Sequence, residues 1–519
     1  MFMNIETAFD RVSQPVETGL DFDMSEVAFK LRPQLEPKTV IIVGGGVAGS
    51  EVGTYLGHTS TIPLQIVEIE REPARKFGGW GFQSFPDSET TNLAMRKMYL
   101  GEDPEEIYRW ASEFVATHRE EFGEITLHRD RPFPRVLMRE YVKWRRSNVK
   151  NDLVNYDSVV GEAMRVTVGE DSSVSVELAD GRVLKGDKVV MASGSISVKV
   201  PDYLTPLAEH PNVIIDPLLK SGHERRAQIP CEARVLVLGT GLTGEEQVNV
   251  LLKSGHKNLT LLSRGGLRHY GYPQEQVNVP LVLNSPPDFL NAETPEEFNE
   301  RLTDFYAQYL SAGHSHEDIL AAVRPYWDRI RADLGGCVQA AQRLHEFRRT
   351  LAVNSIGTSW EVHRNLETAR ERGELTIQHG YISRIDEGQD GFTVHYSESK
   401  DAPSTHSETY DYIINAVGRN IIRHPIWDHL FEDGLAKKHA GIGVQVTESG
   451  QMINSAGVPS EQIWVVGMPR AGDHALRRGY LGNTAFNVPQ VRAHVYNTMG
   501  AMLDGMTQES VATLEHQFC

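Results

Sequence analysis

Two glycine-rich turns are the segments of this sequence whose residue types and spacing most clearly predict chemistry. The first reads Gly-Gly-Gly-Val-Ala-Gly over residues 44–49 and directly follows a β-branched run at residues 39–43. In a strand–turn–helix unit, glycines at these positions permit a tight turn, the approach of a diphosphate and close packing of helix on strand. Unpaired N–H groups at the start of the helix then bind the phosphates. The contacts expected at this turn are Gly44, Gly46, Ala48 and Gly49.

The second turn reads Gly-Thr-Gly-Leu-Thr-Gly over residues 239–244 and follows the apolar run at residues 235–238. Residues 258–262 supply the next strand, so the order of strand, turn, helix and strand recurs. Two copies of this unit in one chain are more specific for dinucleotide binding than either copy alone. The contacts expected here are Gly239, Thr240, Gly241, Leu242, Thr243 and Gly244.

The residue that ends the second strand of each unit predicts which dinucleotide binds there. Glu68 and Ser263 each lie 24 residues after the first glycine of their turn (68 − 44 and 263 − 239), and Arg264 follows Ser263. A carboxylate accepts hydrogen bonds from ribose hydroxyls and repels a 2′-phosphate, whereas a hydroxyl and a guanidinium bind that phosphate. We therefore expect FAD at the first turn and NADPH at the second. Glu70 is the alternative acid if the first strand runs two residues further.

Composition and charge narrow the class of protein. The chain has 52 Lys and Arg against 70 Asp and Glu, a net charge of −18, which argues against a nucleic-acid or anionic-membrane partner. Its 3 cysteines have neither Cys-x-x-Cys nor metal-ligand spacing, so we expect no dithiol redox chemistry and no metal site. No apolar run of about 18 residues occurs, and residues 1–37 are too polar and acidic for a signal peptide. We expect a cytoplasmic protein of several domains without a membrane span.

Three further segments give the sequence a resemblance to the two-dinucleotide-binding flavoproteins, the superfamily that contains the class B flavin monooxygenases. Residues 187–194 (Asp-Lys-Val-Val-Met-Ala-Ser-Gly) are similar to the Asp-x-x-x-(Leu/Phe)-Ala-Thr-Gly segment of N-hydroxylating monooxygenases, with Met191 and Ser193 as departures. Residues 411–419 are a looser copy. Residues 463–467 are similar to the late strand that presents its backbone to the flavin. The resemblance implies that the first two segments mark chain crossings between the FAD and NADPH domains.

Narrower similarity points to FAD monooxygenases that oxidise an amino group, including the nitrosuccinate-forming type. The segments that carry this similarity are residues 78–82, 92–94, 133–135, 239–244 with 263–264, and 360–364. The resemblance spans about residues 39–500. It implies an α/β fold with two Rossmann-type dinucleotide-binding domains and a helical insertion. The expected parts are an N-terminal extension (1–37), a discontinuous FAD-binding domain (38–200 and 411–500), an NADPH-binding domain (201–280 and 351–410), the helical insertion (281–350) and a C-terminal tail (501–519).

The resemblance also implies contacts to the reactive parts of the two cofactors. Trp80 or Phe82 is a candidate for stacking on the flavin, or else a core residue, and Asn92 is a candidate hydrogen-bond partner of the flavin edge or a turn cap. The remaining flavin contacts implied are Gly79, Gly81, Gly467, Asn483 and Thr484. Those implied for NADPH are Ser193 and Gly194.

The sequence gives only candidates for the residues that bind or activate the substrate. Arg135, Arg139 and Arg364 are candidate partners of a substrate carboxylate, with surface or interdomain ion pairs as the alternative. His363 is a candidate general acid or base, and no residue pattern assigns a catalytic group. Whether residues 292–350 form a lid, a contact in a homo-oligomer or extra helical packing stays open.

The leading functional hypothesis is an NADPH-reduced FAD monooxygenase that uses dioxygen, through a flavin C4a-hydroperoxide, to oxidise the amino group of a small amine or amino acid. The F-x-G-x-x-x-H-x-x-x-(W/F) fingerprint of Baeyer-Villiger enzymes is absent between the two turns, which disfavours ketone oxidation. One alternative is an NADPH–flavin oxidoreductase that passes electrons to a quinone, metal centre or carrier protein. Another is a flavoprotein redox sensor that acts through a protein partner.

Overall fold

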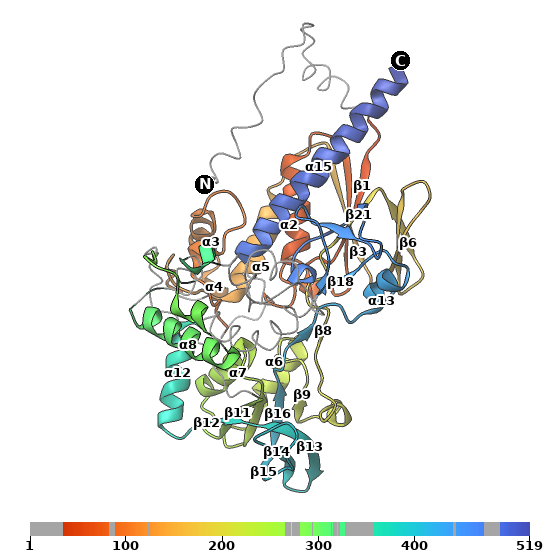
Figure 1. Cartoon of the computed structure of the whole chain (residues 1–519). Helices are drawn as coiled ribbons and strands as arrows, with labels where there is room; N and C mark the ends of the chain where they lie inside the picture. Colours follow the sequence, from red (N-terminus) through yellow and green to blue (C-terminus); the bar gives the residue numbers. More distant parts are fainter. Residues whose placement is uncertain are drawn as a thin grey trace.

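Two mainly parallel β-sheets form separate lobes of the chain, one above the other in Figure 1. The computed structural model describes residues 35–82, 89–122, 125–264, 271, 281–292, 294–312, 314, 319, 322–326, 358–439, 443–471 and 488–518. This arrangement confirms the predicted α/β fold with two Rossmann-type units.

The sheet of the first domain has six strands. In spatial order they are β20 (Gln451–Ile453), β21 (Pro459–Val465), β7 (Lys188–Met191), β1 (Lys38–Val43), β2 (Leu64–Glu70) and β3 (Val154–Val160). All neighbouring pairs are parallel except β20 with β21. Both faces of β1 are covered, because its residues alternate between two separate apolar cores.

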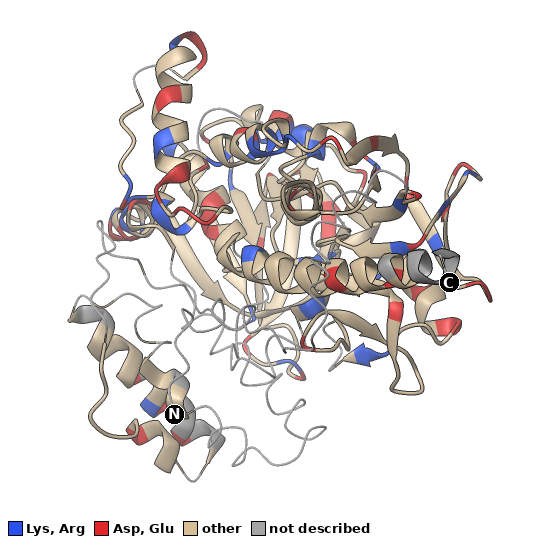
Figure 2. Cartoon of the chain, turned by 90° about the horizontal axis from the view of Figure 1, so that it is seen from above, with Lys and Arg blue, Asp and Glu red and all other residues tan. Residues whose placement is uncertain are grey.

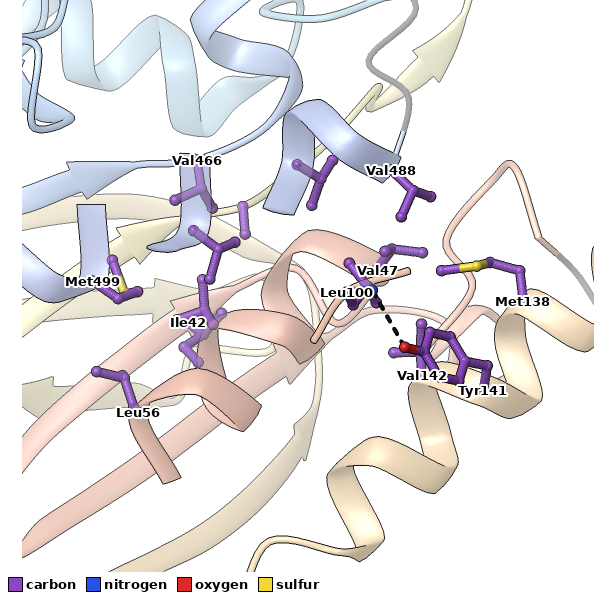
Figure 3. Packing of buried hydrophobic residues seen from close by; sticks show 14 of the residues in the cluster. Ile42, Val47, Leu56, Leu100, Met138, Tyr141, Val142, Val466, Val488 and Met499 are labelled. Atoms are coloured by element: carbon purple, nitrogen blue, oxygen red, sulfur yellow. Dashed lines mark hydrogen bonds between the residues drawn. The ribbon is translucent and has the colours of Figure 1, made fainter. Parts of the chain in front are cut away.

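Helices cover one face of this sheet and further strands cover the other. The helical side holds α2 (Val47–Thr59), α3 (Glu106–Thr117), α4 (Arg119–Phe122), α5 (Arg135–Ser147) and α15 (Val488–Phe518). Figure 3 shows Ile42 of β1 with side chains from α2, α5 and α15, and Leu100 N–H donating to Tyr141 Oη at 3.3 Å. The opposite side holds the sheet β4 (Ala163–Val168), β5 (Val174–Leu178), β6 (Val183–Gly186), the helix α13 (Pro425–Glu432) and the pair β18 (Lys438–His439), β19 (Gly443–Val444).

The C-terminal residues continue the first domain. We expected a tail over residues 501–519, but α15 runs without interruption to Phe518. Met502 and Met506 on this helix are buried in the first core, and Glu509 pairs with Lys188 of β7 at 2.9 Å. Apolar residues at helical spacing therefore extend the domain beyond its expected end.

The second domain has a five-stranded parallel sheet. Its strands in spatial order are β12 (Leu375–His379), β11 (Leu259–Ser263), β10 (Val235–Leu238), β16 (Tyr412–Asn415) and β9 (Val213–Ile214). One face packs on α7 (Leu242–Lys253) and α12 (Trp360–Glu371), and α6 (Lys220–Ala227) lies beside β9. The other face packs on the antiparallel sheet β13 (Tyr381–Gly388), β14 (Gly391–Ser397), β15 (His406–Tyr410).

The chain crosses between the domains twice, at the two segments that the sequence indicated. β8 (Ser197–Val198) leaves the first domain and pairs antiparallel with β17 (Arg419–Asn420), which returns to it. The return lies later than the predicted boundary at residue 411, because β16 pairs with β10 and belongs to the second sheet. The hydrophobic run at 412–415 thus completes the second domain before the crossing.

A small helical cluster lies between β11 and α12 in the chain and has its own apolar core. α8 (Pro295–Ser311) forms over the charged segment predicted to be helical, and its Leu302 and Tyr306 pack with Phe289, Ile319 and Val323. Figure 2 shows Lys and Arg as well as Asp and Glu on the described helices. Among the described residues, no helix combines the length and apolarity needed to traverse a bilayer.

A buried charge network holds the helical side of the first domain together. The Arg145 guanidinium of α5 lies 3.0 Å from a Glu51 carboxylate oxygen of α2 and 2.7 Å from one of Glu106 on α3. Burial raises the pKa of Glu51 to about 7, and the Arg145 charge opposes that shift. Arg145 thus neutralises a carboxyl that water cannot reach.

Replacing Arg145 by methionine should lower the free energy of unfolding by about 3 to 5 kcal/mol, because Glu51 would lose its buried counter-charge. Urea denaturation followed by circular dichroism measures this change. Arg182→Met is the matched control, since the Arg182–Asp180 pair is about half exposed on both sides and its loss should change stability little. Equal effects of the two substitutions would contradict the assigned role of the network.

Candidate dinucleotide-binding sites

A cavity of about 350 Å³ lies beside the first glycine turn, where the two domains meet. Gly44, Gly46 and Glu70 line it from the first domain, and Leu218 lines it from the second. The volume falls in the range of cofactor-binding cavities. The parallel strands of the first sheet end here, which is where ligands of such sheets bind.

Glycines of the first turn are fixed by close backbone packing. Gly44 has a φ of +110°, and a Cβ there would lie 2.6 Å from the Ala192 carbonyl oxygen. A Cβ on Gly49 would lie 1.8 Å from the Gly44 carbonyl oxygen, so the helix could not pack on the strand. Gly46 and Ala48 line the cavity at the start of α2, where free N–H groups can bind a phosphate.

The backbone of the second turn has nearly the same geometry as that of the first. Gly239 has a φ of +101°, and its Cβ would lie 2.6 Å from the Ala416 carbonyl oxygen. A Cβ on Gly244 would lie 1.9 Å from the Gly239 carbonyl oxygen. A Cβ on Gly241 would meet open space, which leaves room for a ligand to approach the backbone.

The acid that faces the first turn is Glu70 rather than Glu68. Glu70 lines the cavity and accepts hydrogen bonds from the N–H groups of Gly45 and Glu72, both at 3.0 Å. Burial raises the pKa of Glu70, and these two N–H groups oppose the shift. Glu68 is 2% exposed and lies 3.1 Å from Arg146 Nη2, so its carboxylate is already neutralised inside the domain.

Strand register explains why Glu70, rather than Glu68, corresponds to Ser263 of the second unit. β1 pairs with β2 at Val43↔Ile69, and β10 pairs with β11 at Leu238↔Leu262. The residues that follow in register are therefore Glu70 and Ser263. Paired strand starts lie 26 residues apart in the first unit (64 − 38) and 24 in the second (259 − 235), so the first connection is two residues longer.

At the second turn, the predicted phosphate partners lie together. Thr240 and Ser263 place their hydroxyl oxygens 2.9 Å apart, which connects the turn to the end of β11. Arg264 is exposed beside them, and its charge lies close enough to Tyr203 to oppose the burial that raises the pKa of that phenol. Leu242 and Thr243 begin α7. A hydroxyl and an exposed guanidinium at a strand end are groups that can bind a 2′-phosphate.

Comparisons with known proteins agree with this geometry. Residues 41–196 match the family model described as FAD-NAD(P)-binding. L-lysine 6-monooxygenase from Pseudomonas syringae is 16% identical with a TM-score of 0.57, and the alignment covers 91% of this chain and 100% of that one. The FAD-bound cadaverine monooxygenase of desferrioxamine biosynthesis from Erwinia amylovora is 11% identical with a TM-score of 0.55, covering 91% and 95%.

Cyclohexanone monooxygenase is 14% identical with a TM-score of 0.53, covering 91% of this chain and 88% of that one. No curated protein matches the sequence. The chain has the fold of the two-domain flavoproteins. Amine and ketone monooxygenases share this fold, so the fold alone does not specify a substrate.

Trp80 lines the cavity, but two guanidinium groups occupy the space over its ring. The Arg75 Cζ lies 3.2 Å from its ring centroid and the Arg419 Cζ lies 3.6 Å from it. Two guanidinium groups this close cannot share one face without collision, so both faces are covered. Gly79, Gly81 and Phe82 also line the cavity, and Phe82 keeps the stacking role as a prediction.

Ser193 and Gly194 line the first cavity rather than the second turn. They follow Ala192, whose carbonyl packs on Gly44, so the crossing segment borders the site that we assign to FAD. The expectation that they contact NADPH is therefore not supported by their position. Gly467 lines the same cavity with a φ of +73°.

Three further residues were predicted to contact the flavin, namely Asn92, Asn483 and Thr484. Asn92 is half-buried between buried neighbours and does not line the cavity, so its contact with the flavin edge lacks support. Asn483 and Thr484 lie outside the described residues. Among the described residues, no group of His, Cys, Asp and Glu is arranged to hold a metal ion.

Arg135 forms the interdomain ion pair that the sequence left open as an alternative. It begins α5 and lies 2.7 Å from Glu246 on α7, the helix of the second turn. It also donates to the carbonyl oxygen of Gly81 at 3.0 Å. Burial raises the pKa of the Glu246 carboxyl, and the Arg135 charge opposes that shift. Arg135 therefore joins the cavity loop to the second domain, and this pairing weakens its candidacy as a substrate partner.

The other substrate candidates are not brought together. Arg139 donates to the Lys76 carbonyl oxygen at 3.2 Å and to Glu140 at 3.0 Å, which supports the loop before Gly78. His363 and Arg364 lie on α12 of the second domain, where the Arg364 guanidinium lies 4.4 Å from the Trp360 ring. Neither of these α12 residues lines the cavity.

Sequence reasoning missed Arg71, Arg75 and Arg419, which line the cavity together. Arg71 and Arg75 follow the acid-ending strand, and Arg419 ends the second crossing motif. The sequence did contain one indication of this site, because Arg419 directly follows Gly418 of the second crossing motif. Because these arginines lie far apart in the chain, the sequence does not show that all three lie near the Trp80 ring.

Replacing Glu70 by glutamine should weaken FAD binding by about 10-fold or more, because a charged acceptor faces the ribose. Fluorescence titration of the apoprotein with FAD measures the affinity. Glu68→Gln is the matched substitution and should leave the FAD affinity nearly unchanged, while lowering the unfolding midpoint because Arg146 loses its partner. Equal weakening of FAD binding by both substitutions would contradict the assignment of Glu70.

Proposed function

We propose that this chain is an FAD- and NADPH-dependent monooxygenase that oxidises an amino group of a small amine or amino acid. The observation that carries the cofactor assignment is the shared register position of Glu70 and Ser263. An acid at this position favours a dinucleotide with a free ribose, and a hydroxyl followed by Arg264 favours one with a 2′-phosphate. The two turns are otherwise nearly identical, so this difference separates the two ligands.

Several groups around the first cavity fit FAD. The Ser193 hydroxyl is buried without a hydrogen-bond partner among the described residues, which suits a polar ligand atom. The start of α2 supplies backbone N–H groups for a diphosphate. When bound, reduced FAD supplies the chemistry that activates dioxygen, and NADPH supplies the electrons.

The chain's own contribution is to position these groups and to keep water away. Val47, Val488 and Val491 line the cavity as an apolar wall, and all three are buried. An apolar wall excludes water from the site, and this prevents side reactions at a reactive centre. Arg135 holds the Gly81 backbone toward α7, so the loop along the cavity and the helix at the second turn keep a fixed separation.

Support for an amino group as the oxidised centre comes from the relatives in structure. The lysine and cadaverine monooxygenases named above act on amines according to their names. Cyclohexanone monooxygenase shares the fold, but the sequence fingerprint typical of ketone oxidation is absent between the turns of this chain.

Replacing Arg264 by alanine should raise the KM for NADPH by about 10- to 100-fold, since a charge-assisted contact to the 2′-phosphate is lost. The KM for NADH should change little, because NADH lacks that phosphate. Steady-state oxidation of each nucleotide measures both values. Arg372→Ala, at an exposed position after α12, is the control and should leave both unchanged. Equal losses for NADPH and NADH would remove the assignment.

Oxygen insertion is tested by screening amino acids and polyamines with isotopically labelled dioxygen. We expect one amine to yield a hydroxylated product that carries the label, with NADPH and dioxygen consumed in equal amounts. Mass spectrometry and an oxygen electrode measure these quantities. If every amine gives only hydrogen peroxide, while a quinone is reduced without oxygen, the chain is an electron-transfer flavoprotein and the monooxygenase proposal fails.

A further inference from the structure

Three cavity-lining residues form a stack that joins the two domains. Arg75 and Trp80 belong to the loop after β2, and Arg419 lies on the crossing strand β17. The guanidinium groups cover opposite faces of the indole at 3.2 and 3.6 Å from its centroid. Such cation–π contacts partly offset the repulsion between two neighbouring cations.

Ion pairs use only part of each guanidinium. Arg75 Nη2 lies 2.7 Å from Glu72, and Arg419 Nη1 lies 3.0 and 3.1 Å from the two carboxylate oxygens of Asp216. Arg75 Nε, Arg419 Nε and Arg419 Nη2 are buried and have no acceptor among the described residues. Buried charged donors without acceptors are unfavourable, so the site is complete only with a further acceptor.

Burial also disfavours the charged form of both arginine side chains. Burial lowers the pKa of Arg75 to about 10, and the Arg419 charge also lowers it. Burial likewise lowers the pKa of Arg419, where the Arg71 charge also lowers it and Asp216 opposes the shift. The Arg75 side chain is only 5% exposed. A pair of poorly hydrated cations at one ring is stabilised most by an anion that both can contact.

The stack lies beside the first glycine turn. A Cβ on Gly46 would lie 3.2 Å from the Gly79 Cα, and Trp80 follows Gly79. A ligand at the start of α2 can therefore meet backbone N–H groups on one side, Arg75 from the loop and Arg419 from the crossing strand. A diphosphate carries enough acceptor oxygens for both.

We propose that Arg75 and Arg419 form an anion subsite for the diphosphate of the dinucleotide held at the first turn. Because Asp216 fixes Arg419 to the second domain, that domain takes part in binding the cofactor of the first. This proposal rests on the assignment of FAD to the first cavity. It makes FAD binding sensitive to the placement of the second domain.

The test measures the affinity of the full-length apoprotein for FAD, ADP and adenosine in four variants. Arg419→Met and Arg75→Met keep an apolar stem over Trp80 and remove the charge, and both should weaken FAD and ADP by about 10-fold or more. Arg419→Lys should recover part of the loss. Adenosine lacks a diphosphate, so its affinity should stay the same. Arg384→Met, at an exposed ion pair of the second domain, is the control and should match the wild type.

Unchanged FAD and ADP affinities in Arg419→Met and Arg75→Met would overturn the subsite. It would also be overturned if Arg419→Lys were as weak as Arg419→Met, or if adenosine affinity fell in parallel, because either result indicates a purely structural role. If ADP binding depends on the arginines but NADPH does not reduce the wild-type flavoprotein, the proposed function fails while the subsite stands.

Discussion

Both domains depend on one backbone contact, which occurs once in each of them. The first glycine of each turn packs against the carbonyl group of a crossing segment, Gly44 on Ala192 and Gly239 on Ala416. A side chain at either glycine would place its Cβ 2.6 Å from that oxygen. Each crossing segment then leads into β8 or β17, which pair with each other. The two glycine turns and the strands that join the domains are therefore one connected unit.

Buried charges set how the two domains meet around this unit. Arg135 pairs with Glu246 across the interface, and Arg419 on the crossing pairs with Asp216. The cost of removing both partners from water largely offsets the attraction within a buried ion pair, while loss of one partner is strongly unfavourable. Such pairs contribute more to a defined arrangement than to net stability. A fixed arrangement suits chemistry in which electrons pass between two bound cofactors.

Much of this architecture follows from local patterns in the sequence, and the errors have physical causes. The two glycine turns, their flanking strands and the crossings were predictable, because close packing restricts which residues fit there. Glu70 could not be chosen over Glu68 by counting, since a connection two residues longer shifts the register. The stack of Arg75 and Arg419 on Trp80 could not be predicted either, because residues far apart in the chain meet only in the folded protein.

The central claim is that the first site holds FAD and the second holds NADPH as its reductant. Anaerobic mixing of the FAD-loaded chain with each nicotinamide dinucleotide, followed by flavin absorbance, tests this claim most directly. We expect NADPH to bleach the flavin at concentrations at which NADH is far slower, because only NADPH carries the 2′-phosphate that Ser263 and Arg264 are proposed to bind. Faster reduction by NADH, or no reduction by either nucleotide, would contradict it.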